Sequence, residues 1–162
     1  MLSAIFLTPL WSASTEAFLK NDLAWIKNAM KKYNLLNLLL IAAGILMLVF
    51  SAPIYRIWLG DGKVDISFSL SFWGFIYFNV IVFGAKYVSF LNGINALRIQ
   101  FLASLLSPLL YILVALVMIK HFKLGASSLF IASVLANFNA YLLAPMQYHK
   151  IINRNKKGIW IK

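Results

Sequence analysis

The sequence predicts an all-α membrane protein, a bundle of four full transmembrane helices. Hydrophobic residues make up 62% of the 162 residues and charged residues only 12%, whereas soluble domains carry about 25% charged residues. Four apolar runs each reach roughly the 20 residues that a helix needs to cross the hydrocarbon core. The basic residues lie in the gaps between these runs, as is typical of membrane proteins. The outer surface of the bundle is therefore predicted to face lipid as well as water.

The first segment, residues 1–19, is expected to be the end of a truncated transmembrane helix. Its apolar part gives way to polar residues at Ser12, so it is too short to span a bilayer. Residues 20–33 are predicted to form a cytoplasmic amphipathic helix that lies at the membrane surface. Its apolar residues recur at helical spacing, at Leu23, Ile26, Met30 and Tyr33.

The segment 34–148 is predicted to be the four-helix transmembrane bundle. Its spans cover about residues 35–52, 68–91, 97–119 and 126–148. Pro53 ends or bends the first span, and Pro108 can kink the third because proline lacks a backbone donor. Between the first two spans, Ile57-Trp58-Leu59 is expected to make a short interfacial turn. Residues 149–162 form a basic tail.

The distribution of positive charge predicts the orientation of the spans. If the tail is cytoplasmic, ten of the 15 basic residues fall on the cytoplasmic side, four on the other side, and Lys86 lies within a span. Cytoplasmic loops carry the excess of Lys and Arg in membrane proteins. We therefore expect a multi-pass protein with a cytoplasmic C-terminus.

Several function classes find no support in the sequence. The absence of cysteine excludes disulfides, thiol catalysis and cysteine-based metal sites. The basic residues form no single patch, so no nucleic-acid partner is expected. No Gly-rich phosphate loop, nucleophile elbow or HExxH motif is present, and His121 and His149 lie among lysines at span ends. The protein is not expected to be an enzyme, and we predict no catalytic residue, metal or cofactor.

Three strings of residues carry a resemblance to one family, and they occur in the order of that family. They are Thr8–Ala13 (TPLWSA) followed by Glu16-Ala17, Phe90–Ile94 (FLNGI) followed by Leu97–Gln100 (LRIQ), and Pro145–Tyr148 (PMQY) with Gly158–Trp160 (GIW). They resemble bacterial polysaccharide transporters, the O-antigen or oligosaccharide-repeat-unit flippases related to the multidrug and toxin extrusion (MATE) exporters. Ser14 departs from the family pattern, which usually has Tyr after Ser-Ala.

The resemblance implies a C-terminal fragment of a twelve-span transporter. The chain would supply the end of helix eight and helices nine to twelve, a partial MATE-like lobe whose partner is the missing N-terminal lobe. The implied function is to flip lipid-linked oligosaccharide or polysaccharide repeat units across the bacterial cytoplasmic (inner) membrane. The implied partners are a polyprenyl pyrophosphate oligosaccharide and membrane lipids. The alternatives are a fragment of a MATE-type drug or cation antiporter and a small non-transporting four-helix membrane subunit.

Polar or charged side chains within the spans or at their ends are the substrate-path candidates: Lys86, Arg98, Asn79, Asn137, Asn139 and Glu16. Among them Lys86 is the most informative, because a charge within the hydrocarbon costs roughly 2.5–3.5 kcal/mol on insertion scales. It either faces a cavity that attracts an anionic headgroup, such as a lipid pyrophosphate, or snorkels to the cytoplasmic headgroups.

The other candidates also have simpler alternatives. An arginine can bind a phosphate through two hydrogen bonds, but Arg98 is more readily explained as a topology anchor. The asparagines must find partners in lipid, and hydrogen bonds between helices are favoured over cavity lining. Glu16 lies at the mouth of the transport path or pairs with Lys20 one turn later.

Overall fold

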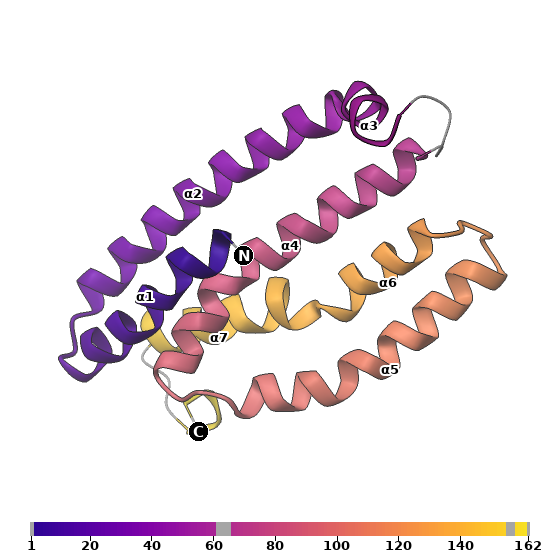
Figure 1. Cartoon of the computed structure of the whole chain (residues 1–162). Coiled ribbons are helices and arrows are strands. Elements are labelled where there is room, and N and C mark those ends of the chain that lie inside the picture. Colours follow the sequence, from indigo (N-terminus) through magenta and orange to yellow (C-terminus); the bar gives the residue numbers. More distant parts are fainter. Residues whose placement is uncertain (1, 61–65, 155–157, 162) are drawn as a thin grey trace.

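The computed structural model describes residues 2–60, 66–154 and 158–161. Within these ranges the chain is helical and contains no strand (Figure 1), so the all-α prediction is confirmed. The elements are α1 (Leu2–Leu19), α2 (Leu23–Val49), α3 (Ser51–Leu59), α4 (Phe68–Gly93), α5 (Arg98–Lys120), α6 (Ser127–Ala136), a π-helical turn η1 (Asn139–Leu143), α7 (Ala144–Ile152) and a 3-10 turn η2 (Gly158–Trp160). Helices α2, α4 and α5 are long and apolar enough to cross a membrane, and α6 with η1 and α7 makes a fourth candidate if the bent pair is one span.

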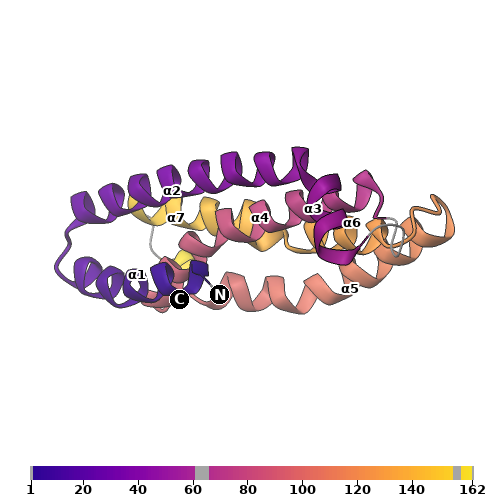
Figure 2. The same cartoon turned by 45° about the horizontal axis from the view of Figure 1, so that its top comes forward.

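Helix α4 is the central element of the bundle. It contacts α1, α2, α6, η1 and α7, while α5 packs mainly against α6 (Figures 1 and 2). The α1–α2 and α4–α5 connections and the C-terminal end of α7 lie at one end, which we call the basic end. Its described basic residues are Lys20, Lys27, Lys31, Lys32, Arg98, Lys150 and Arg154.

The opposite end, which we call the α3 end, carries α3 and the α5–α6 connection (Figure 1). Its described basic residues are Arg56, Lys120 and Lys123. The predicted loop and tail charges Asp61, Lys63, Asp65, Lys156, Lys157 and Lys162 lie outside the described ranges. The two groups of basic connections that the sequence placed on different sides of a membrane are thus at different ends of the bundle.

Helix α2 differs from the prediction of a separate amphipathic helix over 20–33 followed by a span from residue 35. One continuous helix covers both segments, and the Asp22 carboxylate caps it by accepting a hydrogen bond from the Trp25 N–H at 2.9 Å. No Gly or Pro lies near Tyr33, so nothing interrupts the backbone hydrogen bonds there. The lysine-bearing turns are therefore the first turns of the same helix that carries the first apolar run.

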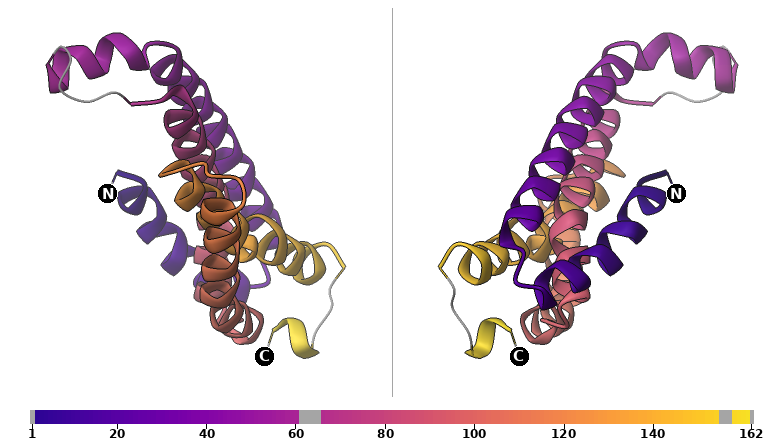
Figure 3. Two further views of the ribbon diagram at one scale, coloured as in Figure 1. Left: turned by 90° about the vertical axis from the view of Figure 1, so that its right-hand side faces the viewer. Right: turned by 90° about the vertical axis from the view of Figure 1, so that its left-hand side faces the viewer.

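Helix α2 ends at Val49, and α3 turns sideways out of the bundle (Figure 3). Pro53 explains the break, because its ring clashes with the carbonyl of residue 49 and it has no N–H to continue the ladder. The first span therefore ends three residues before the predicted boundary at 52. The expected interfacial turn at 57–59 is part of this nine-residue helix.

The last apolar run, expected to be one span over 126–148, is broken between α6 and η1 by a bend of 41°. Pro145 cannot donate to the carbonyl of Tyr141, and the ladder widens just before it, where the Ala144 N–H bonds the Asn139 carbonyl. Helix α5, in contrast, runs through Pro108 without interruption. The bend thus falls at residues 137–138, before the widened turn and Pro145, and not at Pro108, which can kink a helix but lies here within a continuous one.

The main apolar core lies at the basic end. It joins buried residues of α1, α2, α4, α7 and the α4–α5 connection: Ala17, Ile26, Met30, Phe90, Leu91, Ala96, Ala144, Ile151 and Ile152. Close backbone contacts allow this packing, because a Cβ on Gly84 would lie 2.6 Å from the Ala140 Cα, and one on Gly93 would lie 2.7 Å from the Trp11 carbonyl oxygen. Small residues at helix crossings are typical of membrane bundles.

Candidate functional site

Lys86 is a buried cation in the middle of the protein. Its side chain projects from α4 and only 1% of the residue is exposed. The ammonium Nζ lies 4.4 Å from the ring centroid of Phe83 and 5.0 Å from that of Tyr87. Among the described residues, Nζ has no hydrogen-bond partner. The side chain is therefore held against aromatic rings instead of reaching the surface.

The environment of Lys86 does not balance its charge. Cation–π contacts contribute about 0.5–2 kcal/mol, while a central charge costs roughly 2.5–3.5 kcal/mol on insertion scales. In the described part of the chain Lys20 forms an ion pair with Glu16, and no carboxylate pairs with Lys86. The residues of α2, α4, α5, α6 and α7 include no Asp or Glu. A negatively charged ligand at Lys86 would therefore supply a counter-charge that the described residues do not.

Helical spacing places two further polar residues on the facing sides of α4 and α2. Asn79 precedes Lys86 by seven residues, about two helical turns, and therefore shares its face of α4. Phe75, one turn before Asn79, packs its ring against Gly44 of α2, so this face points toward α2. On α2, Asn37 is buried and continues the face of Ile26 and Met30, which belong to the core with α4. We call Asn37, Asn79 and Lys86 the polar seam.

Within the seam, Asn79 satisfies part of its hydrogen-bonding capacity inside its own helix. Its Nδ2 donates to the Phe75 carbonyl oxygen at 2.8 Å. A side chain that bonds its own backbone one turn earlier needs no partner on another helix. Asn79 thus has a hydrogen-bond acceptor within its own helix. The ammonium of Lys86 has no acceptor among the described residues.

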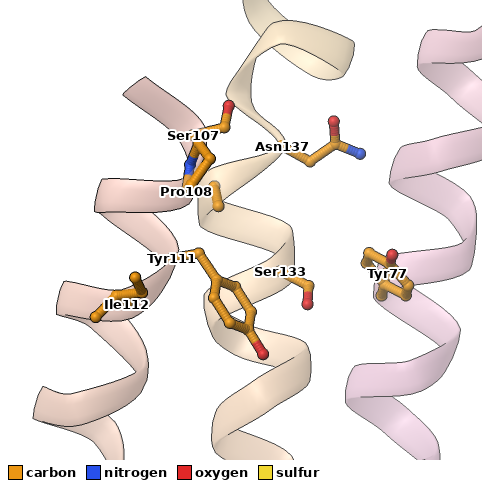
Figure 4. Close-up of a pocket in the computed structure, with 8 residues that line it drawn as sticks. Tyr77, Ser107, Pro108, Tyr111, Ile112, Ser133 and Asn137 are labelled. Carbon is orange, nitrogen blue, oxygen red and sulfur yellow. The ribbon is translucent and has the colours of Figure 1, made fainter. Parts of the chain in front are cut away.

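Asn137 belongs to a second region, a cavity of about 470 Å³ between α4, α5 and α6. Figure 4 shows its amide directed toward the helix that carries Tyr77, with Tyr111 and Pro108 lining the side formed by α5. Asn137 caps α6, and the break that follows it opens this space. Tyr77 lies nine residues before Lys86, on the opposite face of α4. The structure therefore separates the Asn137 cavity from the polar seam.

The remaining candidates are distributed over different elements. Asn139 begins the π-helical turn, and its Oδ1 is buried with no hydrogen-bond partner in the described part of the chain. Arg98 is the exposed first residue of α5, where it has the position of the predicted topology anchor. Glu16 accepts a hydrogen bond from Lys20 at 2.5 Å, and both side chains are exposed. This contact raises the pKa of Lys20 through the hydrogen bond and the negative charge.

Two buried residues with amide side chains, Asn37 and Gln147, were not predicted from the sequence. Asn37 was hidden in the run LLNLLL, although its spacing of seven residues from Met30 places it on the buried face of α2. Gln147 was noted only as part of a motif, yet its Nε2 donates to the carbonyls of Ala96 at 3.0 Å and Trp160 at 2.7 Å. It ties the α4–α5 connection and the C-terminal turn to α7.

The described residues contain no group of His, Asp and Glu that could hold a metal ion. Comparisons with models of known protein families, with curated proteins and with solved structures find no match. The fold and the site therefore define a class by their own features: a helical protein with three to four candidate membrane spans and a buried lysine without a counter-charge.

Proposed function

We propose that the chain is part of a membrane transporter that flips lipid-linked oligosaccharide or polysaccharide repeat units across a bacterial inner membrane. The observation that carries the proposal is the burial of Lys86 without a carboxylate. A polyprenyl pyrophosphate carries its negative charge at the junction of a lipid tail and a sugar headgroup. A buried ammonium between two spanning helices is suited to offset the cost of removing that pyrophosphate from water.

The three motif strings, which begin at Thr8, Phe90 and Pro145, support the assignment to the flippase family. In this proposal α2, α4, α5 and the α6–η1–α7 unit correspond to helices nine to twelve of a MATE-like lobe, and α1 to the end of helix eight. The transporter requires a second lobe, and the two rock about a shared cavity. The C-terminus is cytoplasmic, because the basic end carries more Lys and Arg than the α3 end.

The bend between α6 and α7 supports a transport role. Discontinuous helices occur at the binding sites of secondary transporters, where unwound backbone lines a cavity. The break here carries Asn137 and Asn139, and the former borders a cavity of about 470 Å³. We propose that this region changes its bend as the lobes move, while Lys86 holds the anionic part of the substrate.

Two other functions make different predictions about ligands. A drug or cation antiporter needs an acidic residue within its spans to bind the ion, and the candidate spans contain none. A non-transporting four-helix subunit needs no ligand for Lys86. The flippase proposal therefore predicts binding of an anionic lipid, the antiporter an organic cation, and the subunit neither.

Native mass spectrometry of the full chain in lipid nanodiscs tests these alternatives. The ligands are a polyprenyl pyrophosphate oligosaccharide, the same lipid without the pyrophosphate, phosphatidylglycerol and tetraphenylphosphonium. We expect selective binding of the pyrophosphate lipid. Lys86→Gln should weaken it by about tenfold or more, since a hydrogen bond to a charged group contributes roughly 1.5–3 kcal/mol and about 1.4 kcal/mol is a tenfold change.

Matched variants separate a binding role from general damage. Lys86→Arg keeps the charge and should retain most of the binding. Lys120→Gln removes an exposed lysine at the α3 end and should bind as the wild type does. Equal affinity of wild type and Lys86→Gln for the pyrophosphate lipid would refute the assigned role of Lys86. Preference for tetraphenylphosphonium would favour the antiporter.

A further inference from the structure

Helix α3 is held across the α3 end of the bundle. It extends sideways beyond the ends of α2 and α4 (Figure 3). The Tyr55 hydroxyl lies 3.0 Å from the Ser71 hydroxyl of α4, which fixes the rotation of α3 about its own axis. Beyond this contact, α3 leaves its most apolar side chains uncovered: Ile57 is 87% exposed and Trp58 is 79% exposed.

The residues of α3 divide between two faces. Ile54 and Trp58 are four residues apart and therefore lie on one face of the helix. Ile57 flanks that face, being three residues after Ile54. Arg56 is two residues from both Ile54 and Trp58, about 200° round the helix, and so lies on the opposite side. The helix is amphipathic although it has only nine residues.

The first turn of the apolar face borders the spanning helices. Ile54 and Tyr55 border an apolar groove of about 370 Å³ between α2 and α4, together with Met47 and Phe75. Trp58 shares the face of Ile54 one turn further along α3, beyond the groove, and its side chain is exposed. Arg56 is directed away from the groove. This is the orientation of a helix whose apolar side enters the acyl region while its charge meets the headgroups.

We propose that α3 is an interfacial helix that binds the bilayer surface at the α3 end, with Ile54, Ile57 and Trp58 at the headgroup–acyl boundary and Arg56 at the lipid phosphates. The partner is the lipid bilayer itself. Three features select it: the opposed apolar and basic faces, the position at the ends of two apolar spans, and an exposed Trp, which is enriched at membrane interfaces. The inference does not depend on the transport proposal.

Depth-dependent fluorescence quenching tests this placement in the full chain reconstituted in phosphatidylcholine vesicles. The chain has five Trp residues, and replacing four by Phe leaves Trp58 as the sole indole. The quenchers are phosphatidylcholines brominated near the ester, at mid-chain or near the terminal methyl, and aqueous acrylamide. We expect the largest loss of Trp58 emission from the label near the ester, and weak quenching by acrylamide.

A protein that retains only Trp73 provides the depth reference. Trp73 lies five residues into α4, about 7.5 Å along the helix from Phe68, and should be quenched best by a deeper label than Trp58 is. In the Trp58 protein, Ile57→Asp should increase quenching by acrylamide, because a carboxylate on the apolar face draws the helix into water. Arg56→Gln, on the opposite face, should leave the ranking of the labels unchanged.

Each other outcome overturns the proposal. Strong acrylamide quenching of Trp58 without bromine quenching would place α3 in water. Quenching by neither reagent would mean that protein, for example a second copy of the chain, covers the helix. Strongest quenching by the label near the terminal methyl would make α3 part of a span. If bromine fails to quench Trp73 as well, the helices do not enter the bilayer, and the interfacial assignment of α3 is wrong with them.

Discussion

The two ends of the bundle are stabilised in different ways. At the basic end, α1, α2, α4 and α7 close over a common apolar core that includes Phe90 and Leu91, both fully buried. At the α3 end the large side chains of α3 remain exposed, and a contact between two hydroxyls, those of Tyr55 and Ser71, joins α3 to α4. The basic end is organised by the protein's own packing, and we propose that the α3 end depends instead on lipid.

Gln147→Leu should have the largest effect on stability, at the basic end. Gln147 is completely buried, and its Nε2 bonds the carbonyls of Ala96 and Trp160. Leucine has a similar size but leaves both acceptors without their donor, which we expect to cost about 2–4 kcal/mol. The free energy of unfolding in detergent micelles measures the loss, and an unchanged value would contradict the account of this end.

Alanine substitutions of two glycines of α4 compare the ends directly. A Cβ at Gly93 would lie 2.7 Å from the Trp11 carbonyl oxygen, whereas one at Gly74 would lie 3.8 Å from Phe130, an ordinary contact. Gly93→Ala should destabilise the protein by about 1–3 kcal/mol through overpacking. Gly74→Ala should be neutral, or stabilising by up to about 1 kcal/mol, because alanine favours the helix. If the two substitutions change the free energy of unfolding equally, the proposed difference in packing between the two ends is wrong.

Tyr55→Phe should have a smaller effect at the α3 end. It removes one of two hydroxyls in a half-buried contact and leaves the ring in place, so we expect a loss of about 0.5–1.5 kcal/mol. Ser71→Ala should cost a similar amount. The double variant should cost less than the sum of the two single variants, since both lose the same bond. Full additivity would show that the hydroxyl contact contributes nothing.

The exposed Lys20–Glu16 pair should contribute least. The carboxylate raises the pKa of Lys20 in the folded protein. Any stabilisation is therefore fully present below the pKa of Lys20 in the unfolded chain and is lost as the pH rises through the folded value. Melting temperatures of wild type and Lys20→Gln should differ slightly at neutral pH and converge in strong base. A difference that grew with pH would contradict the sign of this shift.

The helical fold could be predicted because long apolar runs with few charges are compatible with little else in a membrane. The position of the break in the last span could not. Prolines lie in two spans, yet α5 continues through Pro108, and the last span bends at residues 137–138, ahead of Pro145. A proline removes one hydrogen bond in either case, so the outcome depends on which neighbouring helices support the backbone on each side.

The site was only partly accessible from the sequence for a similar reason. Lys86 could be singled out, because a charge in an apolar run is costly wherever it points. Its actual neighbours, Phe83 and Tyr87, follow from helical spacing, but the enclosure of its ammonium requires the packing of other helices against α4. Asn37 was invisible because one amide hardly changes the hydropathy of its run. The face of a helix on which a residue lies predicts its burial only when the helix that packs against that face is known.

Lys86 lies where the packed end meets the rest of the bundle, and the proposed site depends on its burial. Covalent labelling of lysine amines in the reconstituted protein, read by mass spectrometry after proteolysis, tests it most directly. We predict that Lys86 stays unmodified under conditions in which the exposed Lys27 and Lys120 react, and that it reacts once the protein is unfolded. Modification of Lys86 in the folded protein at the rate of Lys27 would show that its ammonium reaches the surface, and would contradict the account.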